Sequence, residues 1–113
     1  MNAIRNKVQL IGNLGAVPEI KTMDSGKKHA QFNVATSETY RNAKGEKVTE
    51  TQWHRVICWG KLAEIAEKYL TKGREIALEE KLITRSYTDK EGNKKYVTEI
   101  QAHELLLLGS KDE

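Results

Sequence analysis

The sequence KLAEIAEKYLTKG, residues 61–73, is the segment that sets the expected fold of this 113-residue chain. Its apolar residues fall at positions i, i+3, i+4, i+7 and i+8, which form one face of an α-helix: Leu62, Ile65, Ala66, Tyr69 and Leu70. Gly73 suits the end of that helix, because glycine tolerates the left-handed conformation with which many helices close. The segment therefore predicts one short helix in a chain that otherwise follows a different period.

On both sides of this segment, apolar and polar residues alternate, which is the period of β-strands. The alternating segments are residues 6–15, 29–38, 48–60, 74–87 and 96–108. Pro18 follows the first of them and marks a bend or a strand edge. Apolar rows on these strands supply the expected interior: Val8, Leu10, Phe32, Val34, Val56 and Ile76.

The order of elements is therefore three strands, one helix and two strands. This order predicts an all-β fold with one helix, namely a five-stranded Greek-key barrel of the oligonucleotide-binding type (OB-fold). The helix is expected between strands 3 and 4, where it plugs one end of the barrel. The alternative is an α+β domain with an open sheet.

Composition limits the class of protein. A chain of 113 residues favours one domain, and 38% hydrophobic with 31% charged residues indicates a folded domain. The longest purely apolar run, residues 105–108, is far shorter than the ~20 residues that span a membrane. Residues 1–12 contain no continuous apolar run typical of a secretion signal. The net charge of +3 is consistent with an anionic partner.

The single cysteine and the histidines are the residues to consider for catalysis or metal binding. Cys58 has no second cysteine for a disulfide and no partner at zinc-ligand spacing, which fits a reducing compartment. His54 shares one row of a strand with Cys58, but four residues of strand span about 13 Å. The sequence also lacks a phosphate-binding loop and paired acids. We therefore expect no enzyme, metal or cofactor, with His29, His54 and His103 in structural roles.

The stretch TQWHRVICWG, residues 51–60, holds both tryptophans of the chain. Even positions carry His54, Val56 and Cys58, and the compact pair among them suits a narrow barrel interior. Odd positions carry Trp53, Arg55, Ile57 and Trp59. Tryptophan is often a core residue, but an unpaired buried arginine is costly, so this row is expected to face outward. Aromatic rings beside a guanidinium suit stacking on flat anionic partners, whereas Ile57 has no evident role there.

Aromatic and basic residues recur together at two other places. Arg85 and Tyr87 share a row of the fourth strand, and Tyr40 precedes Arg41 after the second strand. Glu80 lies on the inward row of the fourth strand, where an unpaired carboxylate is costly. We expect a bend, a bulge or a basic partner at that position.

Several motifs together resemble the bacterial single-stranded DNA-binding (SSB) protein family. They are NKVQLIGNLG, ATSETYR, TQWHRV, WGKLAEIAEKYLTKG and LITRSYTDKEGNKKYVTE, and the resemblance runs from residue 6 to about residue 109. It implies an OB-fold domain over residues 1–109 that assembles as a homotetramer. It also implies sequence-tolerant binding of single-stranded DNA in DNA replication, repair and recombination, in the cytoplasm at the nucleoid.

The resemblance implies roles for particular residues. Aromatic side chains that stack on bases would be Tyr40, Trp53, Trp59 and Tyr87. Basic side chains along the DNA path would be Lys7, Arg41, Arg55, Lys61, Lys72 and Arg85. His54 matches a histidine near the subunit interface. No membrane partner is implied.

The sequence also departs from the family pattern. Glu80 stands where relatives usually have glycine. Residues 110–113 are expected to be a short remnant without the acidic tail that recruits other replication proteins, so that recruitment is not assigned. The alternative within related barrels is a dimeric primosomal or restart factor, and the four aromatic positions argue against it. The number of subunits distinguishes these two possibilities.

Overall fold

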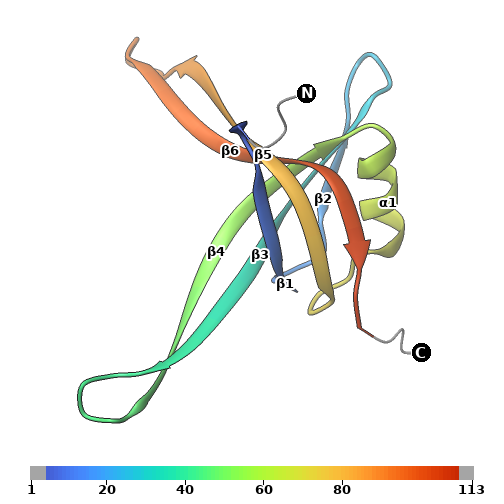
Figure 1. Ribbon diagram of the computed structural model, residues 1–113. Helices are drawn as coiled ribbons and strands as arrows, with labels where there is room; N and C mark the ends of the chain where they lie inside the picture. The colour runs from blue at the N-terminus through green and yellow to red at the C-terminus, as the bar shows by residue number, and fades with distance from the viewer. Residues whose placement is uncertain (1–4, 110–113) are drawn as a thin grey trace.

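The protein is described here from a computed structural model, which covers residues 5–109; the expected remnant at residues 110–113 lies outside the described part. Figure 1 shows long, curved strands with one helix beside them. The elements in chain order are β1 (Val8–Leu14), β2 (Glu19–Thr22), β3 (Lys28–Arg41), β4 (Lys47–Trp59), α1 (Lys61–Tyr69), β5 (Glu75–Thr88) and β6 (Lys94–Leu107). The expected all-β fold with one helix is confirmed.

The strands form one sheet that closes on itself. Their order is β1-β5-β6-β4-β3-β2, and β1 also pairs with β3, so five of the six strands complete a barrel. Closure occurs where Asn13 and Leu14 of β1 pair with Ala35 and Val34 of β3. A Cβ on Gly12 would lie 2.1 Å from the carbonyl oxygen of Ala35, so only glycine allows the two strands to approach this closely. The expected closed barrel is thus correct, and the open-sheet alternative is wrong.

The predicted position of the helix in the strand order is wrong. Helix α1 lies between the fourth and fifth strands, because the residues after Pro18, where a bend or a strand edge was expected, make the additional strand β2. Strand β2 pairs antiparallel with the start of β3, from Glu19 opposite Gln31 to Thr22 opposite Lys28. Ile20 is the single apolar residue of β2, so this strand shows no alternating pattern in the sequence.

The end of the helix also differs from the prediction. Leu70 already leaves the helix in an extended conformation and is buried, whereas Gly73 was expected to end it. Gly73 instead adopts a φ of 85° in the turn before β5, where its N–H donates to the Leu14 carbonyl. Burial of Leu70 against the barrel therefore overrides the local glycine signal. Helix α1 packs against β3, β4 and β6.

The core lies inside the barrel and under the helix. Four of the six expected interior residues are buried, namely Phe32, Val34, Val56 and Ile76. Val8 and Leu10 are only half-buried, because this end of β1 pairs with β5 alone, whereas β3 joins β1 only at Asn13 and Leu14. The small residues Ala63 and Ala66 let α1 approach the strands closely.

Two long hairpins extend from the barrel in different directions (Figure 1). Each tip is closed by one polar side chain that accepts backbone N–H groups. Asn42 Oδ1 accepts from Lys44 and Glu46 in the β3–β4 loop. Asp89 Oδ1 plays the same part in the β5–β6 loop. Such turns give both loops a defined shape.

Glu80 is fully buried, and neither of its carboxylate oxygens has a hydrogen-bond partner among residues 5–109. One of the expected responses is present, since the β5–β6 pairing has a bulge between Glu79 and Glu80, where His103 of β6 is the extra residue. A basic partner is not found in the part of the chain that is described. Burial, with a smaller contribution from the charge of Glu79, raises the pKa of Glu80 to about 7.

We expect Glu80 to make stability depend on pH. Its pKa in the folded chain lies above its usual value of 4.5, so the protonated form stabilises the fold. That contribution is complete below pH 4.5 and is lost as the pH rises to about 7. Relative to Glu80→Gln, which keeps the shape without the charge, the wild-type free energy of unfolding should fall by about 2–3 kcal/mol over this range.

Urea unfolding at several pH values measures this difference. Glu91→Gln, in the exposed β5–β6 loop, is the matched control and should track the wild type. A wild-type-to-Glu80→Gln difference that stays constant with pH would contradict the assignment.

Candidate nucleic-acid interface

Alternation along β4 places its side chains as the sequence predicts. Trp53 is 59% exposed, and the side chain of Arg55 is 51% exposed. Val56 and Cys58 on the opposite row are fully buried in the barrel. Strand β4 therefore separates an aromatic and basic outer row from an apolar inner row.

His54 and Cys58 share the inner row but have separate surroundings. The Nε2 atom of His54 lies 2.9 Å from the hydroxyl of Thr36 on β3. Burial raises the pKa of the Cys58 thiol to about 12, so this thiol stays protonated at neutral pH. Residues 5–109 contain no group of three or more His, Cys, Asp or Glu side chains that could hold a metal ion. Nothing in this inner row resembles a catalytic pair.

Trp59 is half-buried and is held from two sides. The ring of His29 on β3 meets it edge-on, with 4.4 Å between the ring centroids and 62° between the planes. The Nζ atom of Lys27 lies 5.6 Å from the centroid of the Trp59 ring, within the range of a cation–π contact. Trp59 thus offers a partly covered ring beside a cation.

Ile57 faces the same way as Trp53 and Trp59, yet it is only 4% exposed. Its cross-strand partners on this face are Gln31 of β3 and Gln101 of β6, since β4 lies between those two strands. Ile57 is an apolar centre of the outer face rather than a member of its exposed row.

The indole ring of Trp53 packs against Gly15. A Cβ at this position would lie 2.6 Å from Cζ3 of the indole, so the ring packs directly against the glycine backbone. A shallow pocket beside the ring is lined by residues of the β1–β2 connection and of β3, among them Val17 and Asn33. One side of the indole is therefore fixed while most of the ring stays open to solvent.

Four polar side chains form a transverse row over the outer face, which we call the arginine row: Gln31, Arg55, Glu99 and Arg85, from β3, β4, β6 and β5. Arg55 Nη2 donates to Gln31 Oε1 at 2.8 Å, and Arg55 Nε lies 3.6 Å from Glu99 Oε2. Arg85 donates twice to Glu99, from Nε at 3.0 Å and from Nη2 at 3.2 Å.

Glu99 is only 3% exposed, and it was not singled out in the sequence. Hydrogen bonds from Arg85 are the main reason that the pKa of Glu99 is held below its usual value. The available signal was indirect, because arginines on a partly covered face need a counter-charge. The sequence did not identify which of its many acidic residues supplies it.

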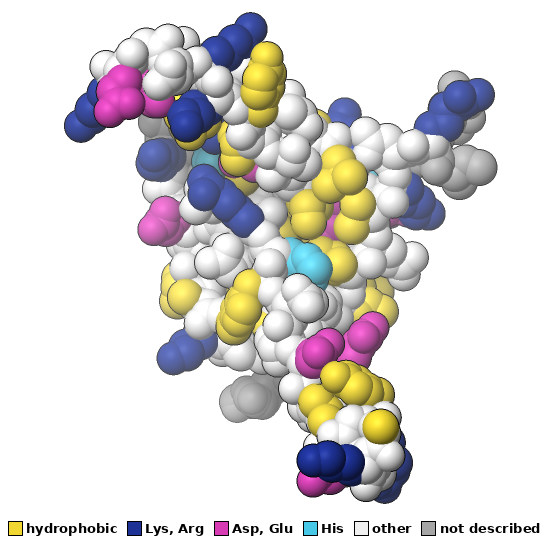
Figure 2. All heavy atoms as spheres, turned by 90° about the vertical axis from the view of Figure 1, so that its left-hand side faces the viewer, with side chains coloured by type: hydrophobic (Ala, Val, Ile, Leu, Met, Phe, Trp, Pro, Cys, Tyr) yellow, Lys and Arg dark blue, Asp and Glu magenta, His cyan; other side chains and the backbone are white. Residues whose placement is uncertain are grey.

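The remaining aromatic candidates lie on the two hairpins. Tyr40 on β3 is 45% exposed and its hydroxyl donates to Glu50 at 3.2 Å, while Tyr87 on β5 is 49% exposed. Arg41 donates to the Gly45 carbonyl within its own loop. The four aromatic side chains are therefore spread over β4 and both hairpins rather than gathered in one pocket. Figure 2 shows separate exposed hydrophobic groups interspersed with basic side chains over one side of the molecule.

The basic candidates fall into different settings. Lys7 makes an ion pair with Glu79 across β1 and β5 at 2.7 Å, away from the arginine row. Lys61 and Lys72 are exposed at the two ends of the helical segment, and neither forms an ion pair within residues 5–109. The structure thus does not bring Lys7 together with the other candidates.

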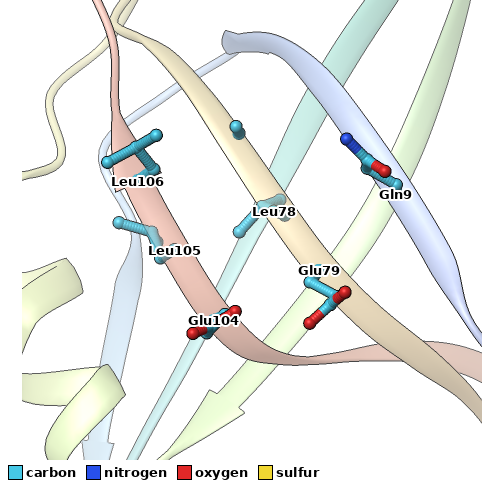
Figure 3. Close-up of a pocket in the computed structure, with 7 residues that line it drawn as sticks. Gln9, Leu78, Glu79, Glu104, Leu105 and Leu106 are labelled. Atoms are coloured by element: carbon cyan, nitrogen blue, oxygen red, sulfur yellow. The ribbon is translucent and has the colours of Figure 1, made fainter. Parts of the chain in front are cut away.

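A second exposed surface lies on the outside of β1, β5 and β6. Register places Ile11, Ala77 and Leu106 side by side across the three strands, and Ile11 and Leu106 are 51% and 62% exposed. Figure 3 shows the pocket beside this row, with Leu106 at one end and Glu79 and Glu104 at the other. We call Ile11, Ala77 and Leu106 the apolar row. It is separate from the face that carries Trp53.

We expect Gly15→Ala to displace the Trp53 ring, because the added methyl would occupy the space of Cζ3. In a Trp59→Phe background, Trp53 is the only tryptophan, so its fluorescence reports the change directly. The emission maximum should shift and acrylamide quenching should increase. Ser25→Ala, in the exposed turn before β3, is the control, and identical spectra for all three proteins would contradict this packing.

Comparisons with known proteins agree on one family. The family model described as "Single-strand binding protein family" matches residues 5–108. A protein named "Single-stranded DNA-binding protein 1" from Xylella fastidiosa is 49% identical over 109 residues, covering 96% of this chain and 80% of that protein. The protein of the same name from Chlorobaculum tepidum is 47% identical over 108 residues, covering 95% and 67%.

Solved structures give the same result. A chain described as "Plasmodium falciparum SSB complex with ssDNA" superimposes with a TM-score of 0.79 at 34% identity, covering 92% of this chain and 95% of that one. A deletion mutant of the single-stranded DNA binding protein from Thermus aquaticus gives a TM-score of 0.80 at 29% identity, covering 94% of this chain and 51% of that one. The barrel, its outward aromatic strand and these matches together establish that this chain belongs to the single-strand binding protein family.

Proposed function

We propose that this chain binds single-stranded DNA with little dependence on base sequence, in DNA replication, repair and recombination. The observation that carries the proposal is the outer row of β4, where Trp53 is 59% exposed beside the half-exposed guanidinium of Arg55. The relatives named above are single-stranded DNA-binding proteins, and one solved relative is described in complex with single-stranded DNA.

The chemistry of this surface suits a single strand. Every base has a flat π-face, so exposed rings can stack on any base once it is free of its partner strand. Tyr40, Trp53, Trp59 and Tyr87 would supply the rings, spread along β4 and the hairpins as an extended strand requires. A duplex hides its base faces, and therefore cannot use separate exposed rings in this way.

The basic side chains would hold the backbone of the strand. Arg41, Lys61 and Lys72 are exposed and can reach phosphates, whereas the charge of Lys7 is already met by Glu79. Lys7 therefore fits better as part of the β1–β5 surface than as a phosphate contact. Arg55 and Arg85 occupy the arginine row between the tryptophans and the β5–β6 hairpin.

We further propose that the domain comprises residues 1–109, acts without catalysis, and works as a homotetramer in the cytoplasm at the nucleoid. No helix in the described part of the chain is long and apolar enough to cross a membrane. The apolar row on β1, β5 and β6 is the surface best suited to contact another subunit, since its exposed side chains lie side by side across the three strands. His54, although half-buried behind Thr36, remains a candidate for a second subunit contact.

Removal of the Trp53 ring tests the stacking role. We expect Trp53→Ala to weaken binding of a dT oligomer by about 1–3 kcal/mol, with a similar loss for other base sequences. Fluorescence anisotropy of labelled oligomers measures this loss. Tyr96→Ala removes another aromatic side chain that is 67% exposed but lies opposite Ser86, in the other row of the hairpin from Tyr87, and should bind normally. If Trp53→Ala bound the oligomers with unchanged affinity, Trp53 would not stack on bases.

A charge in the apolar row tests the assembly. We expect Leu106→Lys to lower the subunit number seen by size-exclusion chromatography with light scattering, because a charge buried in an apolar contact is costly. Val17→Lys, at a side chain that is 67% exposed and lines the pocket beside Trp53, should leave the subunit number unchanged. A tetramer that persists in Leu106→Lys would place the assembly contact elsewhere.

A further inference from the structure

A buried carboxylate lies in the middle of the surface proposed to bind a polyanion. Glu99 is 3% exposed, and it lies between two arginines whose side chains are 51% and 54% exposed. Its negative charge offsets part of the attraction of the two guanidinium groups for phosphate, so these groups are not simple phosphate contacts. The arginine row therefore needs a different explanation from the free lysines.

We propose that the arginine row contacts bases rather than phosphates, with Glu99 as the positioning residue that holds Arg55 and Arg85 in place for this role. This inference rests on the proposed binding of single-stranded DNA. In this arrangement, lysines away from the row would neutralise phosphates, and the guanidinium groups of the row would contact the bases.

The hydrogen bonds of Arg85 fix the orientation of its guanidinium plane. Nε and Nη2 both donate to Glu99, at 3.0 and 3.2 Å, which is the bidentate geometry that locks the group against rotation. The second terminal nitrogen, Nη1, and the exposed face of the plane stay available. A base can stack on that plane or accept a hydrogen bond at its edge.

Arg55 is oriented in a similar way from the other side. Its Nη2 atom donates to Gln31 Oε1 at 2.8 Å, and its Nε atom lies 3.6 Å from Glu99. One carboxylate thus serves two guanidinium groups from different strands, which leaves the three charged groups with a net charge of only +1. Guanidinium planes that are held in a fixed orientation and whose charge is largely balanced favour contact with bases over attraction of phosphates.

The position of the row fits this task. It crosses the outer face beside Trp53 and Trp59, because the register pairs Arg55 with Asn33 and Ile57 with Gln31 on neighbouring strands. A base leaving one indole would therefore meet a guanidinium plane next. By contrast, Lys61 is exposed and forms no ion pair within residues 5–109, as a phosphate contact requires.

A comparison of normal and abasic DNA tests the proposal. Binding of a dT oligomer and of an abasic oligomer with the same number of phosphates would be measured at several salt concentrations. We expect Arg85→Gln to weaken dT binding about fivefold or more, as for the loss of one base contact. Binding to the abasic oligomer should change by less than about twofold, and the slope of log K against log salt should not change.

Lys61→Gln is the matched control for a phosphate contact. It should weaken binding to both oligomers equally and reduce the steepness of the salt slope by about 0.7. Arg85→Lys keeps the charge but loses the flat plane, so it should behave like Arg85→Gln if the row contacts bases. Glu99→Gln should free both guanidinium groups, steepen the salt slope and strengthen binding to the abasic oligomer at low salt.

The outcomes separate the inference from the function on which it rests. Equal losses for Arg85→Gln on both oligomers, with a slope shallower by about 0.7, would overturn the base-contact role while leaving DNA binding intact. Normal dT binding by Arg85→Lys would overturn it as well, and does not depend on how Glu99→Gln folds. Failure of the wild type to bind either oligomer would instead overturn the proposed function itself.

Discussion

The closure of the barrel at Gly12 is the constraint on which the remaining structure depends. Strands β1 and β3 can meet there only because no Cβ stands between Gly12 and the Ala35 carbonyl. Once the sheet is closed, every strand has one row of side chains inside and one outside. Val34 and Val56 then fill the interior, and Trp53 is directed outward beside Arg55. The separation of the Trp53 face, which we propose binds DNA, from the apolar row, which we propose contacts another subunit, follows from this single close approach.

The closed barrel also explains how polar groups can be organised on its outer face. Hydrogen-bonded strands hold Arg55, Glu99 and Arg85 at fixed spacings, so their side chains meet without large losses of conformational entropy. The same rigidity leaves Glu80 on the inside without a hydrogen-bond partner among residues 5–109, next to the bulge in the β5–β6 pairing. Glu99 therefore binds arginines of the outer face as a carboxylate with a lowered pKa. Glu80 has a raised pKa, and its burial is compatible with the fold when the carboxyl group is protonated.

Much of this arrangement could be predicted from the sequence, because alternation reports which way a side chain points. The strands, the helix and the outward direction of Trp53 followed from period alone. Period does not report what a neighbouring strand places over a residue, which is why buried Ile57 and the counter-charge at Glu99 were missed. Strand β2 was missed because it has a single apolar residue, and the helix end because burial of Leu70 prevailed over Gly73. Alternation indicated a stacking surface at Trp53, Arg55 and Trp59, whereas single-stranded DNA as the partner came from the family resemblance.

The central claim is that bases of single-stranded DNA lie on the outer face of β4. Titration with a dT oligomer followed by NMR tests it directly, because each tryptophan indole N–H and each arginine Nε–H gives its own resonance. The account predicts large shifts for the indoles of Trp53 and Trp59 and for Arg55 and Arg85, with small shifts at Ile11 and Leu106. Shifts confined to β1, β5 and β6 around Ile11 and Leu106, with both indoles unchanged, would contradict it.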